Sequence, residues 1–90
     1  MHIVDEQTYG LRSKSYSTKL SVTICNYRSV YVYLWWVNYS GRYVYYGAIR
    51  PRRCYRQRSY GTHPLVIAEY NGRIIATVIP YTRNVNLSIR

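Results

Sequence analysis

The run Val30–Val37, with the sequence V-Y-V-Y-L-W-W-V, constrains the fold more than any other part of the chain. Branched and aromatic residues of this kind suit the pleated surface of a β-strand. The run is also far too short to cross a membrane as a helix. A cluster of turn-forming residues follows at once in Asn38-Tyr39-Ser40-Gly41. We therefore predict a buried central strand, a hairpin turn, and a returning strand over Arg42–Tyr46.

The rest of the sequence divides in the same way into short strands and turns. Leu20–Cys25 alternates apolar and polar residues, which is the period of a half-buried strand. Asn71-Gly72 stands between two apolar runs and is the strongest hairpin signal in the chain. Pro51 and Pro80 interrupt or end strands because proline cannot donate to the hydrogen-bond ladder. The strands expected in addition to 30–37 and 42–46 are 20–25, 54–60, 65–69, 73–79 and 84–89, the last as a short edge strand.

Composition agrees with this reading. Val, Ile, Thr, Tyr and Trp together make up 38 of the 90 residues, and no segment of useful length has the period of a helix. Ninety residues allow one domain with one modest core. We predict an all-β fold, a small antiparallel β-sandwich of about six or seven short strands. Residues 1–10 are expected to form an N-terminal arm and residues 11–90 the domain.

The chain is strongly basic, with a formal net charge of +10. Five arginines cluster with interleaved tyrosines at Arg50, Arg52, Arg53, Arg56 and Arg58. Arginine beside exposed aromatic rings suits phosphate contact and base stacking, so binding of nucleic acid or another polyanion is one hypothesis. The alternative is that these cations keep a small β domain soluble and protect its edge strands.

The inventory of reactive residues argues against an enzyme. Asp5, Glu6 and Glu69 are the only carboxylates, and two of them lie in the expected arm. The two histidines and two cysteines lack metal-ligand spacing, so we expect no metal and no cofactor. The N-terminus has acids where an export signal carries cations, so we expect a cytoplasmic protein, which could also enter the nucleus. In that compartment Cys25 and Cys54 are expected to be thiols rather than a disulfide.

One segment suggests a binding site. Ser59-Tyr60-Gly61-Thr62-His63 places a hydroxyl and an imidazole four residues apart across a bend. Each group can both donate and accept a hydrogen bond, which suits the recognition of a neutral hydroxyl in a sheltered pocket. The alternative is that Ser59 caps the turn and His63 lies at the surface.

The order and spacing of several motifs resemble a known family. The motifs are Leu11-Arg12-Ser13, Cys25-Asn26, Trp36-Val37-Asn38-Tyr39-x-Gly41, Tyr46 and Ser59-Tyr60-x-x-His63. Together they resemble the von Hippel-Lindau (VHL) β domain, from about Leu11 to Ala68. Thr62-His63-Pro64 followed by Asn71-Gly72-Arg73 is similar to the stand-alone VHL-like β domains. The resemblance implies a β-sandwich, in agreement with the prediction from composition.

The resemblance also implies a ligand, a 4-hydroxyproline in an extended segment such as that of hypoxia-inducible factor α. Ser59 and His63 match the positions that contact the prolyl hydroxyl, and Trp36 matches the indole that packs on the pyrrolidine ring. Tyr46 matches a phenol that hydrogen-bonds the peptide, and Tyr60 matches a tyrosine at the side of the pocket. Because neighbouring strand residues point to opposite faces, Trp35 is then expected on the other side of the sheet from Trp36.

The chain departs from the family pattern at several positions. Leu65 replaces a tryptophan at the pocket wall, Gln57-Arg58 replaces an Arg-His pair, and Ser15 replaces an asparagine at the rim. We assign Ser15, Tyr39 and Leu65 to the rim of the expected pocket. We expect the helical domain, through which the resemblance implies docking to elongin C and a cullin ligase, to be absent. The expected partner is therefore a prolyl-hydroxylated peptide or protein, and contact with elongin C is not expected from this chain alone.

Overall fold

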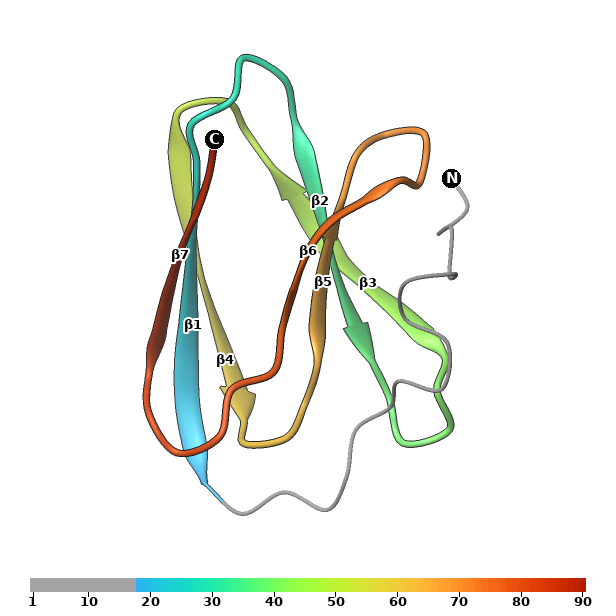
Figure 1. Ribbon diagram of the computed structural model, residues 1–90, viewed down its shortest axis with the longest axis vertical. Helices are drawn as coiled ribbons and strands as arrows, with labels where there is room; N and C mark the ends of the chain where they lie inside the picture. Colours follow the sequence, from blue (N-terminus) through green and yellow to red (C-terminus); the bar gives the residue numbers. More distant parts are fainter. Residues whose placement is uncertain (1–17) are drawn as a thin grey trace.

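The computed structural model describes residues 18–90, which form two facing β-sheets and contain no helix (Figure 1). The all-β class and the sandwich architecture predicted from the sequence are confirmed. Each observed strand overlaps an expected one and differs mainly at its ends. The strands are β1 (Lys19–Asn26), β2 (Val32–Val37), β3 (Tyr43–Ile49), β4 (Arg53–Tyr60), β5 (Leu65–Ala68), β6 (Ile74–Val78) and β7 (Val85–Ile89).

One sheet has three strands in the order β4-β1-β7, and the other has four in the order β3-β2-β5-β6. The chain crosses between the sheets after β1, after β3, after β4 and again after β6 (Figure 1). Among the described strands, β1 and β7 form a parallel pair, while the other pairings are antiparallel. The predicted antiparallel pairing therefore holds for the other strand pairs, and the edge strand β7 is the exception. The register of this edge strand depends on residues more than sixty positions apart, which local sequence patterns do not report.

Both hairpin turns lie where the sequence predicted them. Gly41 has φ of 81° and Gly72 has φ of 89°, values in the left-handed region that favours glycine. The backbone N–H groups of Gly41 and Gly72 donate to the carbonyls of Asn38 and Glu69. The turn residues therefore close the β2–β3 and β5–β6 connections and fix the register of both strand pairs.

Alternate residues of β1, β2, β5 and β7 build most of the main core between the sheets. In β1 these are Leu20, Val22 and Ile24, and they face Leu34, Leu65 and Ile67 of the other sheet. Burying a branched aliphatic side chain stabilises a fold by about 1.5–3 kcal/mol. This core holds the two sheets together and sets the positions of the side chains at their ends.

Trp35 and Trp36 point to opposite sides of β2, as predicted. Trp36 packs against the main core, whereas Trp35 packs with Val37, Val66 and Ile74 in a second cluster. The partner register of β2 shifts between Leu34 and Trp35, where β3 carries an extra residue. Tyr46 and Ile49 are three residues apart, so in a regular strand their side chains would point to opposite faces of the sheet. The bulge lets both side chains pack on the main core.

The buried Asn26 joins the turns at the far end of the sandwich. Its side chain is 1% exposed and its Nδ2 donates to the carbonyls of Val30, Ile49 and Arg50. Its Oδ1 accepts from the backbone N–H of Arg28. A buried amide with its donors and acceptor satisfied stabilises these turns, because leaving any of those groups unpaired is costly.

Cys25 and Cys54 form a disulfide, so the prediction of two separate thiols was wrong. The residues are direct partners across the β1–β4 ladder, and both lie on the side of the sheet away from the main core. Their positions in the sequence do not report this, because 29 residues and two other strands separate them. The disulfide joins the middle of the three-stranded sheet to its edge strand.

Candidate binding site

A tight bend carries the chain from the end of β4 to the start of β5 and presents His63 at one end of the sandwich. Backbone N–H groups of Gly61, Thr62 and His63 donate to the carbonyls of Thr18, Pro80 and Tyr60. Thr62 has φ of 67°, a left-handed conformation that costs a β-branched residue on the order of 1–3 kcal/mol. Two hydrogen bonds to separate segments, and a third within the bend, hold this strained backbone in place.

His63 is enclosed by aromatic rings. Its side chain is 5% exposed, and its ring stacks on Trp36 with centroids 5.5 Å apart and an interplanar angle of 27°. Tyr39 and Tyr60 contact it edge-on at 5.2 Å and 5.3 Å. The Tyr39 hydroxyl and His63 Nε2 share a hydrogen bond of 3.0 Å. These contacts fix both the plane and the rotation of the imidazole, which is a buried group and not the surface histidine of the alternative interpretation.

Trp36 is the centre of the aromatic group. Besides stacking on His63, it lies nearly parallel to Tyr46, with centroids 6.3 Å apart and an angle of 19°. It also meets Tyr39 edge-on at 6.1 Å. The result is a row of rings, His63, Trp36 and Tyr46, contributed by the β4–β5 bend and by strands β2 and β3.

Tyr46 brings a neutral phenol to this row. Burial raises its pKa above the usual value near 10, and the neighbouring Tyr55 adds a smaller contribution in the same direction. Its hydroxyl is therefore protonated at neutral pH and can donate a hydrogen bond as well as accept one.

Ser59 lies on the inner face of β4, directly before Tyr60. It is 7% exposed and is the register partner of the core residue Leu20. The buried hydroxyl of Ser59 and the buried imidazole of His63 therefore lie on either side of Tyr60 and the bend, at the same end of the sandwich.

The predicted rim residues have three different outcomes. Tyr39 is 51% exposed but contacts His63 directly, a role that sequence reasoning did not give it. Leu65 lies in the main core with no exposed surface, so it is not a rim residue. Its alternation with Val66, which is buried in the second cluster on the other side of the sheet, is the signal that could have shown this. Ser15 lies outside the described residues.

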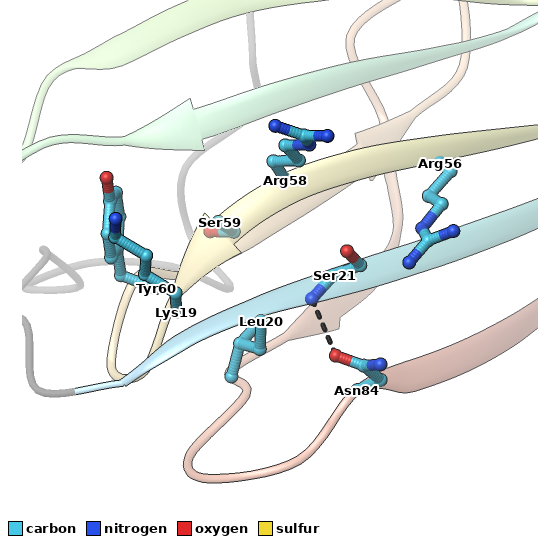
Figure 2. Close-up of a pocket in the computed structure, with 8 residues that line it drawn as sticks. All are labelled: Lys19, Leu20, Ser21, Arg56, Arg58, Ser59, Tyr60 and Asn84. Atoms are coloured by element: carbon cyan, nitrogen blue, oxygen red, sulfur yellow. Dashed lines mark hydrogen bonds between the residues drawn. The ribbon is translucent and has the colours of Figure 1, made fainter.

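The five predicted arginines do not form one patch. Arg50 and Arg52 belong to the β3–β4 turn, and Arg53 is the register partner of Asn26 at the far end of β4. Arg56 and Arg58 lie on the outer face of the three-stranded sheet and line a hollow of about 500 Å³ with Lys19 and Tyr60 (Figure 2). Lys19 was missed because only the β1–β4 register places it beside these residues.

Two searches of residues 18–90 gave negative results. No three His, Cys, Asp or Glu side chains come together there as a possible metal site. That part of the chain also contains no helix long and apolar enough to cross a membrane.

Comparison with models of known protein families gives a match. The family model described as the VHL beta domain matches residues 11–76, which include strands β1 to β5 and the β4–β5 bend. The matched range contains Trp36, Tyr46, Ser59 and His63. A comparison with curated proteins finds no match.

Proposed function

The chain belongs to the VHL β-domain family, and on that basis we propose that it recognises 4-hydroxyproline in an extended segment of a partner protein. Domains of this family are substrate-recognition modules and bind protein substrates. The observation that supports 4-hydroxyproline as the ligand is the ordered row of His63, Trp36 and Tyr46. The buried Ser59 lies at the end of β4, directly before the bend that carries His63.

Ser59 and His63 are the residues proposed to form hydrogen bonds with the hydroxyl of the 4-hydroxyproline. Both side chains are less than a tenth exposed, and each can act as donor or acceptor. A ligand hydroxyl would satisfy both groups, whereas an unmodified proline would leave them without that partner at about 1–3 kcal/mol each. Two such losses correspond to a preference on the order of 10²–10⁴ for the hydroxylated residue.

The aromatic rings complete the proposed pocket. The exposed part of Trp36 would pack on the flat pyrrolidine ring, and the Tyr46 phenol would hydrogen-bond a peptide group next to it. Tyr39 is a positioning residue in this account: its hydroxyl holds His63 Nε2 and so orients the imidazole toward the proposed pocket. Because the ring is already oriented, less conformational entropy is lost on binding.

The rest of the bound segment would lie along β4. This strand pairs with β1 on one side and is the edge of its sheet. An extended peptide can add to such an edge through backbone hydrogen bonds, which supply affinity without dependence on sequence. Affinity would then come from the edge strand and specificity from the pocket.

The test is a titration with two peptides that differ by one hydroxyl. The wild-type protein is expected to prefer the hydroxyprolyl peptide by on the order of 10² or more, as measured by calorimetry. Ser59→Ala and His63→Ala are each expected to remove most of that preference. Ser88→Ala, at an exposed serine of β7, is the matched control and should retain it. Equal affinity of the wild-type protein for both peptides would refute the proposal.

A further inference from the structure

A basic hollow lies beside the candidate binding site at the end of β4 and shares Ser59 and Tyr60 with it. The hollow has a volume of about 500 Å³ and is lined by Lys19, Leu20 and Ser21 of β1, Arg56, Arg58, Ser59 and Tyr60 of β4, and Asn84 before β7. Its three cations, Lys19, Arg56 and Arg58, lie on the side of β1 and β4 away from the main core. The backbone N–H of Ser21 donates to Asn84 Oδ1 at 2.8 Å, which fixes the Asn84 amide at the rim (Figure 2).

The three cations at this hollow have no carboxylate side chain to balance them within the described residues. Glu69 is the only Asp or Glu in residues 18–90, and it pairs with Arg28 at 3.0 Å. Arg56 and Arg58 lie two residues apart on one face, and Lys19 is a diagonal neighbour of Arg58 in the register. Like charges this close repel each other, so an anionic ligand would be favoured at this face.

The arrangement of the cations suits a chain of anions better than a single small one. In Figure 2 the guanidinium groups of Arg56 and Arg58 point to opposite sides of β4, and Lys19 lies next to Tyr60 at the strand end. A polymer with repeated negative charges could contact each in turn as it crosses the strand.

The neighbouring uncharged groups favour nucleic acid over an acidic peptide. Ser21, Thr23 and Asn86 share the outer face with the cations and can hydrogen-bond phosphate or sugar oxygens. Tyr60 is 36% exposed at the end of the hollow, and an aromatic ring beside arginines is a platform on which a base can stack. We infer that this outer face binds single-stranded nucleic acid through Lys19, Arg56 and Arg58, with a base stacked on Tyr60.

The test compares two triple variants that lose the same charge. Lys19→Gln/Arg56→Gln/Arg58→Gln removes the cations of the hollow. Arg50→Gln/Arg52→Gln/Arg73→Gln removes three exposed cations from the β3–β4 and β5–β6 turns. Binding of a fluorescent single-stranded oligonucleotide of about a dozen residues is measured by anisotropy across a salt series. Circular dichroism melts check that both variants fold.

The wild-type protein is expected to bind with a steep salt dependence. The hollow variant should lose at least about tenfold in affinity at low salt, and the slope of log K against log salt should become shallower by about 2. The turn variant should change both quantities much less. Equal losses in the two variants would overturn the site, because charge alone would then explain binding. Polyglutamate bound as tightly as the oligonucleotide, through the same three residues, would overturn the choice of nucleic acid.

Discussion

At its end, strand β4 has buried polar side chains on its inner side and exposed, charged side chains on its outer side. On the inner side, Ser59 and the neighbouring His63 are 7% and 5% exposed and sit with neutral aromatic rings. On the outer side, Arg56 and Arg58 are exposed and charged. Adjacent residues of one strand face opposite sides, so Arg58 and Ser59 belong to different surfaces although they are neighbours in sequence.

This difference separates two kinds of recognition. A buried neutral pair discriminates through the cost of an unmade hydrogen bond, which salt does not screen. An exposed cationic face attracts ligands over a distance, but its interactions weaken when salt is added. One strand can therefore supply a selective pocket and a charged surface, and each is open to separate tests.

The largest expected effect comes from the Cys25–Cys54 disulfide, which joins β1 to β4, the strand that carries both regions. Cys25→Ser/Cys54→Ser opens a loop with a sequence separation of 29 and is expected to lower the free energy of unfolding by about 3–4 kcal/mol. Urea unfolding of the variant and of the reduced wild-type protein should show matching losses. A variant as stable as the oxidised wild type would show that β1 and β4 do not depend on this bond.

A smaller effect is expected from Tyr39→Phe, which alters the pocket alone. The change keeps the ring but removes the hydroxyl that holds His63 Nε2 at 3.0 Å. Affinity for the hydroxyprolyl peptide should fall by about 2- to 10-fold, the value of one hydrogen bond of about 0.5–1.5 kcal/mol. Oligonucleotide binding should not change. Tyr81→Phe, at an exposed tyrosine, serves as the control, and the assignment of Tyr39 as a positioning residue fails if both variants behave alike.

The smallest effect concerns alkaline pH and two tyrosines of β3, Tyr46 in the aromatic row and Tyr45 beside Trp35 on the other side of the sheet. Burial raises the pKa of Tyr46 and of Tyr45 above the usual value near 10. The unfolded chain therefore loses these protons first, so their stabilisation is complete below pH 10 and declines as pH rises from about 10 toward the folded pKa values. Urea midpoints of the wild-type protein should fall more steeply in this range than those of Tyr45→Phe/Tyr46→Phe. Parallel curves would mean that neither phenol is desolvated.

Local patterns in the sequence were sufficient to predict most of the fold. The alternation in Leu20–Cys25, the run ending at Trp36, and the Asn71-Gly72 turn each depend on residues a few positions apart. The opposite orientation of Trp35 and Trp36 follows from the same local geometry. These features required no knowledge of which strands pair.

Most of the features that were missed depend on pairing between distant segments. Cys25 meets Cys54, Lys19 meets Tyr60, and β7 pairs in parallel with β1 only because of the register of the three-stranded sheet. The resemblance to the VHL β domain named Trp36, Tyr46, Ser59 and His63, and the structure brings three of them into one stacked row. It did not give the contact of Tyr39 with His63. It also did not give the burial of Leu65, a position at which this chain differs from the family pattern.

The most direct test of the account is the salt dependence of the preference for the hydroxylated peptide. The ratio of the two dissociation constants, prolyl over hydroxyprolyl, is measured at low and at high KCl concentration. If neutral groups read the hydroxyl, the ratio stays on the order of 10² or more at both concentrations, although both affinities weaken as the basic face is screened. A ratio near one, or a ratio that collapses as salt is added, would contradict the account.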